Sequence, residues 1–284
     1  MGDIYLNGNV LADDKQVNLN GTSMANVYFN GSLIWTHALF ITATGGTITT
    51  DGDYKVHRFT GSGTFQVTSA GNAAGSTSVD YLVVAGGGYS SGAGGWSGTG
   101  GGGAGGYRTS YGSGDISGGN SAVESAYSVS AQSYTITVGG AYSNSSALGI
   151  TSIRGGYGGT RGNNGQSGGS GGGGGYLSSA GGAGTSGQGT AGRGGSTGGN
   201  GNGGGGGASS STGAGFYSTI TGASVGLAGG GAHHPGTGWT GSAYGGGADN
   251  QHGTANTGGG GGTNYGVQQY NGGSGVVIIR YKYQ

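Results

Sequence analysis

Two groups of residues have types and spacing that could do chemistry. The first, Gly165-Gln166-Ser167-Gly168-Gly169, matches the G-x-S-x-G pattern that exposes a nucleophilic serine at a turn from a strand into a helix. Here it lies in a glycine- and serine-rich tract where such matches arise by chance, and no strand–turn–helix pattern surrounds it. We therefore predict no catalytic residue and a protein that is not an enzyme.

The second group contains side chains that bind divalent metals. His233, His234, Asp249 and His252 fall within twenty residues. Adjacent side chains on an extended chain point to opposite sides, so one site would use only one of the paired histidines. A metal at a symmetric tip is one interpretation, and exposed loop histidines that contact a receptor or solvent are the other. We favour the second and predict neither a metal nor a cofactor.

Charge and cysteine content exclude several classes of protein. Nine basic and nine acidic residues give a formal charge of zero, and no lysine occurs between Gly86 and Gly275. Without a basic stripe to follow a phosphate backbone, nucleic acid is not expected as a partner. The absence of cysteine excludes disulfides and thiolate metal sites. No signal-peptide pattern or membrane-length apolar run is present, so we expect synthesis in the cytoplasm.

Glycine dominates the middle of the chain, because 72 of the 83 glycines lie between Gly86 and Gly275. Collagen would need a strict Gly-X-Y period with abundant proline, and the chain has one proline. A calcium-binding β-roll would need an aspartate in each repeat, and silk would need alternating glycine and alanine. We therefore predict a bundle of left-handed polyglycine II helices, which glycine alone allows to approach closely and to pair through their backbones.

The first 37 residues hold a repeated pattern of an alternating strand followed by Asn-Gly. The dipeptides are Asn7-Gly8, Asn20-Gly21 and Asn30-Gly31. Asn-Gly favours the two-residue type I′ hairpin turn. We predict a small β module of three or four strands over residues 1–37. It is too small to be stable alone, so it attaches to another protein or trimerises, or it serves as an N-terminal cap.

Residues 38–284 are predicted to form a glycine-rich domain. Its β-sandwich-like frame covers about 38–85, 121–154 and 274–284, and the bundle with its loops covers about 86–120 and 155–273. Tyr81 to Ala85 and Val276 to Tyr281 are apolar runs typical of strands covered on both faces. Gly61-Ser62-Gly63 is a plausible hairpin turn. No window has a helical period, so the expected fold class is all-β with essentially no α-helix.

Segments rich in aromatic residues separate the glycine runs. Parallel helices need turns at their ends, so these segments should form loops there, where large rings on a rigid support suit recognition. The predicted receptor-binding residues are Tyr107, Tyr111, Tyr176, Phe216, Tyr217, His233, His234, Trp239, Tyr244, His252, Tyr265 and Tyr270. For attachment through the N-terminal module we single out Tyr5, Tyr28, Phe29 and Trp35.

Three strand signatures resemble the glycine-rich domain of bacteriophage virion proteins. They are Val79 to Gly88, Tyr134 to Gly139, and Gly273 to Tyr281. The resemblance covers roughly residues 40–284, and proteins of this type resemble phage tail-fibre adhesins with a polyglycine II sandwich. It implies a virion protein that binds a bacterial surface receptor, an outer-membrane protein or a glycan, and that joins another virion protein through residues 1–37.

Two alternatives to an adhesin stay open at this point. One is a non-adhesive structural virion protein, such as a head fibre, a decoration protein or a tail component. The other is an ice-binding bundle, although the irregular aromatic loops and the lack of cysteine suit it poorly. Three copies on a fibre axis and a single copy at a tip are both compatible with the sequence.

Overall fold

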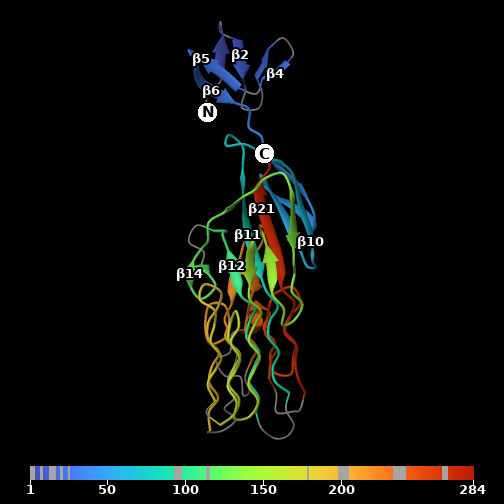
Figure 1. Cartoon of the computed structure of the whole chain (residues 1–284), viewed down its shortest axis with the longest axis vertical. Helices are drawn as coiled ribbons and strands as arrows, with labels where there is room; N and C mark the ends of the chain where they lie inside the picture. Colours follow the sequence, from blue (N-terminus) through green and yellow to red (C-terminus); the bar gives the residue numbers. More distant parts are fainter. Residues whose placement is uncertain are drawn as a thin grey trace.

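The computed structural model describes residues 4–6, 9–12, 17–19, 22–24, 26–92, 98–112, 116–177, 179–197, 205–232, 241–263 and 268–284. Side chains are described within these ranges from Met24 onward, except for Phe29. The fold is all-β, as predicted, and the helical structure in the described ranges is one 3-10 turn, η1 (Gly241–Tyr244). Three parts follow one another along the long axis: N-terminal hairpins, a β frame and a glycine bundle (Figure 1).

The N-terminal part contains six short strands rather than three or four. They are β1 (Ile4–Leu6), β2 (Asn9–Ala12), β3 (Val17–Leu19), β4 (Thr22–Met24), β5 (Asn26–Phe29) and β6 (Ser32–Thr36). Strands β1 to β4 form one antiparallel sheet, and β5 pairs with β6. Asn30-Gly31 lies between the paired strands β5 and β6, as the repeat predicted, whereas Asn7-Gly8 and Asn20-Gly21 lie outside the described residues. Asn30 and Gly31 have φ of 47° and 77°, the left-handed values that a type I′ turn requires.

Two sheets build the frame. The larger has the order β12-β11-β21-β9-β8, with β15 paired to β11, and the smaller has the order β16-β10-β7. The strands of the larger sheet are β8 (Thr47–Asp51), β9 (Tyr54–Phe59), β11 (Ser78–Val84), β12 (Tyr107–Thr109), β15 (Tyr127–Ser128) and β21 (Val276–Lys282). Those of the smaller are β7 (Ile41–Thr44), β10 (Gly63–Ala70) and β16 (Ser133–Ile136).

Two apolar clusters cover the two faces of the larger sheet. Between the sheets, Phe65 on β10 packs with side chains that include Tyr81 and Ile279. On the other face, Leu82 and Ile278 pack with residues of a hairpin at residues 216–227, which lies between two glycine runs of the bundle. Strands β11 and β21 are therefore buried on both sides, which confirms the prediction from their continuous apolar runs.

The prediction of a hairpin at residues 61–63 is wrong. The flanking strands belong to different sheets, because β9 pairs with β8 and β21 whereas β10 pairs with β7 and β16. Phe59 and Phe65, on either side of the turn, both enter the cluster between the sheets. Because both rings are buried between the sheets, the turn connects a strand of one sheet to a strand of the other. The turn residues alone could not indicate this.

The glycine bundle has a hydrogen-bond pattern with a period of three residues. Gly100, Gly103 and Gly106 donate to the carbonyls of Gly159, Gly156 and Ile153, all on one neighbouring segment. The intervening Gly102 and Gly105 donate to Gly261 and Gly258 on another segment, and Ala104 donates to Gly206 on a third. A pleated strand would alternate between two directions. Three directions are those of the predicted polyglycine II helix.

Some of the segment predicted as bundle and loops belongs to the frame instead. Strand β12 lies in the larger sheet, and the hairpin of β19 (Phe216–Ser218) and β20 (Val225–Leu227) covers that sheet's outer face. Burial of their aromatic and β-branched side chains against the sheet stabilises these segments as part of the frame and not of the bundle. Two further short hairpins are β13 (Ile116–Ser117) with β14 (Ser121–Ala122), and β17 (Ser145–Ala147) with β18 (Ile150–Ser152).

Candidate binding surfaces

The turns at residues 161–162 and 176–177 lie at the end of the bundle farthest from the N-terminal hairpins (Figure 1), and the predicted binding residue Tyr176 belongs to the second of them. The N–H of Gly162 donates to the carbonyl of Tyr176 at 2.8 Å, so the two turns lie side by side. The guanidinium of Arg161 lies 5.9 Å from the centre of the Tyr176 ring. Next to it, Leu177 is 46% exposed with a φ of 78°. A cation, a ring and an apolar side chain therefore share this distal surface.

A second aromatic surface lies at the junction of frame and bundle. Tyr217 on β19 is 56% exposed, and its ring centre lies 4.8 Å from that of Tyr244 in η1. Gly229, where the chain enters the bundle, donates to the carbonyl of Tyr244. These two predicted binding residues form a pair, but at the bundle end opposite to Tyr176.

Three predicted binding residues belong to the core of the frame, which corrects the expectation that they lie in exposed loops. Tyr107 on β12 is 2% exposed, and its ring packs 5.2 Å from that of Phe216. Tyr111 is half-buried against the same cluster. Alternation of Tyr107, Thr109 and Tyr111 in the sequence was a strand signal that could have placed them in a sheet.

His252 and Tyr270 lie together on the bundle. The ring centres are 5.5 Å apart, and Nδ1 of His252 accepts a hydrogen bond from the N–H of Asn271. Tyr270 is only 6% exposed and pairs through its backbone with Ser90, so the prediction that its ring is available to a receptor is wrong. The Tyr270 ring lies against His252, and its hydroxyl donates to Asn250 Oδ1 at 3.4 Å. The exposed His252 remains accessible.

The remaining predicted positions, His233, His234, Trp239 and Tyr265, lie outside the described residues. Among the residues that are described, no three His, Cys, Asp or Glu side chains come together in a group that could hold a metal ion.

A tyrosine cluster on the side of the bundle was missed by sequence reasoning. The ring of Tyr142 stacks on Tyr89 at 5.5 Å and meets Tyr157 edge-on at 5.9 Å. The guanidinium of Arg154 lies 4.0 Å from the centre of the Tyr142 ring. Burial raises the pKa of Tyr157, and Tyr142 and Tyr89 raise it further. These residues come from three separate segments, and no local signal in the sequence brings them together.

The N-terminal attachment residues are divided between core and surface. Trp35 is 9% exposed and packs on Met24 and Val27, so it stabilises the module instead of facing a partner, contrary to expectation. Tyr28 is 60% exposed, and Leu33 and Ile34 on β6 are 54% and 50% exposed. Tyr5 and Phe29 lie in β1 and β5, and their side chains are outside the described part of the chain.

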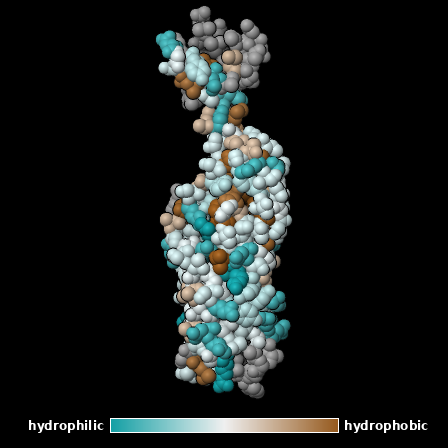
Figure 2. Space-filling model, in the orientation of Figure 1, coloured by the Kyte–Doolittle hydropathy of each residue, from teal (hydrophilic) through white to brown (hydrophobic). Residues whose placement is uncertain are grey.

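Hydropathy on the visible face of the bundle is mostly intermediate, with separate hydrophilic patches (Figure 2). No helix in the described ranges is long and apolar enough to cross a membrane. No family model, curated protein or solved structure matches this chain.

Proposed function

We propose that this protein is a bacteriophage virion component that binds a receptor on the bacterial surface through the distal end of its glycine bundle. The observation that carries the proposal is the position of Arg161 and Tyr176, on turns at the end opposite the N-terminal hairpins (Figure 1). A surface at this end projects away from whatever holds the hairpins. The receptor would be an outer-membrane protein or a glycan.

Rigidity of the bundle supports recognition at its tips. Each polyglycine II segment of the bundle, here called a thread, is hydrogen-bonded to several neighbouring segments. The turns are therefore held by backbone contacts on more than one side. A preorganised surface loses less conformational entropy on binding than a mobile loop. The turns can also change sequence while the threads that carry them stay the same, which suits a protein that must follow changes in its receptor.

Attachment to another virion protein is the role we propose for the N-terminal hairpins. Tyr28, Leu33 and Ile34 expose large apolar side chains on the small β5–β6 hairpin. Exposed apolar side chains on so small a unit are typical of a surface that another protein covers. The protein then resides on the surface of the phage particle, on the outside of the head or tail.

Competition for adsorption tests the proposal. Purified full-length protein is added to cells that are susceptible to the phage encoding it, and both binding to cells and the rate of phage adsorption are measured. We expect saturable binding and slower adsorption. If the folded protein neither binds nor slows adsorption, the receptor-binding proposal is wrong, and a structural role as a head fibre, decoration protein or tail component takes its place.

A further inference from the structure

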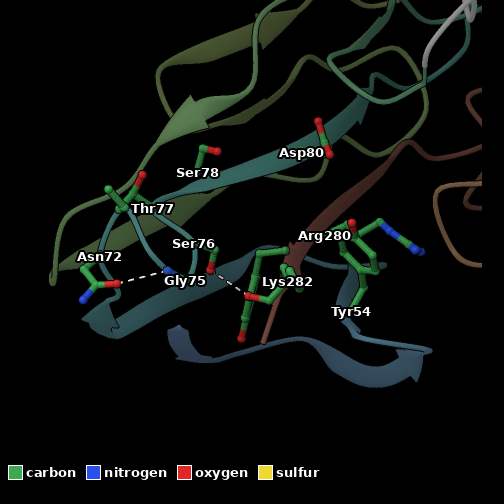
Figure 3. A pocket seen from close by; sticks show the side chains of 11 residues that line it. Tyr54, Asn72, Gly75, Ser76, Thr77, Ser78, Asp80, Arg280 and Lys282 are labelled. Atoms are coloured by element: carbon green, nitrogen blue, oxygen red, sulfur yellow. Dashed lines mark hydrogen bonds between the residues drawn. The ribbon is translucent and has the colours of Figure 1, made fainter. Parts of the chain in front are cut away.

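A cavity of about 340 Å³ opens on the frame, and Figure 3 shows the side chains that line it. Its floor is the outer face of the larger sheet, where β11, β21 and β9 lie next to one another. The segment from Asn72 to Ser78 forms one wall. This segment is fixed by the Asn72 side chain, which accepts from the N–H of Leu39 and of Gly75, and donates to the carbonyl of His37.

Cross-strand pairing sets the side chains of the floor. Asp80 on β11 pairs with Arg280 on β21, and Lys282 pairs with Tyr54 on β9. Val79 and Tyr281, the intervening residues, point into the cluster between the sheets, so Asp80, Arg280 and Lys282 point to the opposite face. Register therefore brings a carboxylate, two cations and an aromatic ring to one surface.

Arg280 already has partners within the protein. Its Nη1 donates to Asp51 Oδ2 at 2.7 Å and to the carbonyl of Ile220 at 3.1 Å. The guanidinium also lies 4.3 Å from the centre of the Tyr54 ring. Because Arg280 is 7% exposed and neutralised by Asp51, it acts as a support for the Tyr54 ring and contributes little free charge to the cavity.

Other polar groups of the lining have unused hydrogen-bonding capacity. Asp80 accepts from Ser110 through Oδ1, and within the described residues its Oδ2 has no hydrogen-bond partner. Within the same residues the ammonium of Lys282 makes no ion pair and lies 5.8 Å from the centre of the Phe40 ring, and the hydroxyls of Thr77 and Ser78 make no hydrogen bond. Burial raises the pKa of Asp80 from its usual value, as expected for a carboxyl with an incomplete set of partners.

The mixture of groups excludes simple ligands. Lys282 would repel a metal cation, and Asp80 would repel a phosphate or another compact anion. An apolar ligand would leave the carboxylate, ammonium and hydroxyl groups without water or partners. A neutral molecule with several hydroxyl groups satisfies all of them, since each hydroxyl both donates and accepts.

We infer that this cavity binds one neutral saccharide unit of a glycan. Asp80 Oδ2 would accept hydrogen bonds from sugar hydroxyls, while Lys282 and the hydroxyls of Thr77 and Ser78 would donate to ring and hydroxyl oxygens. The Tyr54 ring, 37% exposed and held by Arg280, would contact the apolar face of the sugar. The inference does not rest on the proposed receptor function, because the cavity lies on the frame and not at the distal tips.

Saturation-transfer NMR on the full-length protein tests the inference. The probes are the methyl glycosides of glucose, galactose, mannose and N-acetylglucosamine, with inorganic phosphate and glycine as charged comparisons. We expect saturable transfer to at least one sugar, and at least a tenfold lower association constant in both Asp80→Asn and Lys282→Ala. Asp53→Asn is the matched control, because Asp53 lies next to Tyr54 outside the lining; it should bind like the parent protein.

Several results would overturn the inference. They are no transfer to any of the four sugars, equal sugar binding in the parent and both cavity variants, or competition by phosphate or glycine that both variants abolish. Thermal unfolding of each variant shows whether it is folded. Lys282→Ala changes an exposed side chain and keeps the test decisive if Asp80→Asn is destabilised.

Discussion

The N–H of Gly103 donates to the carbonyl of Gly156 at 2.9 Å, across two threads that are 53 residues apart in sequence. A Cβ built on Gly103 would lie 2.6 Å from the carbonyl oxygen of Gly171 and still closer to that of Ser170. The obstacle is backbone on a third thread, which cannot rotate away as a side chain could. At Gly103, therefore, the threads can approach this closely only because the residue has no side chain.

Gly103→Ala should therefore destabilise the protein by at least about 2 kcal/mol, because overpacking against backbone forces neighbouring threads apart. Gly140→Ala is the control. A Cβ there has no neighbour within 4 Å and φ is not positive, so alanine should be neutral or stabilising by about 0.5 kcal/mol. Chemical denaturation of both variants measures the difference, and equal stabilities would contradict the close-packed arrangement of threads.

His57 should make stability depend on pH below neutrality. Its ring is fully buried, with Nδ1 at 2.7 Å from the Gly45 carbonyl and Nε2 at 3.0 Å from the Tyr281 hydroxyl. The carbonyl can only accept, so Nδ1 carries the proton and Nε2 accepts from Tyr281. Burial raises the pKa of Tyr281 to about 12, which keeps that hydroxyl protonated as a donor.

Burial also lowers the pKa of His57 in the folded protein below the value of 6.5 expected when unfolded, despite the opposing hydrogen bond to Gly45. The unfolded state then binds the extra proton first. The stability contribution is complete above pH 6.5 and is lost as pH falls below it. Compared with His57→Gln, the parent protein should lose up to about 1.4 kcal/mol more per pH unit in this acidic range.

Equilibrium unfolding at several pH values measures this slope. Parallel pH profiles for the parent and His57→Gln would show that His57 is not the titrating group.

Glu124 should contribute more stability than an ordinary surface carboxylate. It accepts from the Tyr81 hydroxyl at 2.7 Å and from Nε and Nη2 of Arg108 at 2.6 Å each. Glu124→Gln should cost about 2 kcal/mol, since hydrogen bonds to a charged partner are stronger than neutral ones. Tyr81→Phe combined with Glu124→Gln should cost less than the sum of the two single changes, because they share one interaction.

Denaturation of the two single variants and the double variant completes the cycle, with Asp53→Asn as a carboxylate control. Strictly additive effects would mean that the contact between Tyr81 and Glu124 contributes nothing to stability.

The two aromatic surfaces should differ in their effect on adsorption. Arg161→Ala and Tyr176→Ala change the distal turns and should weaken competition with phage at least tenfold, without lowering the melting temperature. Tyr217→Ala removes an equally large exposed ring at the opposite end of the bundle and should compete like the parent protein. If Tyr217→Ala abolishes competition while both distal variants retain it, the binding surface lies at the junction with the frame.

Much of the architecture could be predicted because its signals are local. Asn-Gly marks the hairpins, continuous apolar runs mark β11 and β21, and a glycine-rich tract with few charges and one proline indicates polyglycine II. Each follows from what a few neighbouring residues can do: adopt a positive φ, bury both faces of a strand, or present no Cβ.

Only the tertiary structure decided which aromatic rings are free. Tyr107 and Tyr176 both follow a glycine, yet Tyr107 enters the core of the frame and Tyr176 caps a distal turn. Likewise, Asp80 and Lys282 meet at one cavity only through the pairing of β11 with β21. Burial and register depend on contacts between segments far apart in the chain. Because glycine has no side chain, the sequence of a thread gives almost no indication of which neighbouring threads it will contact.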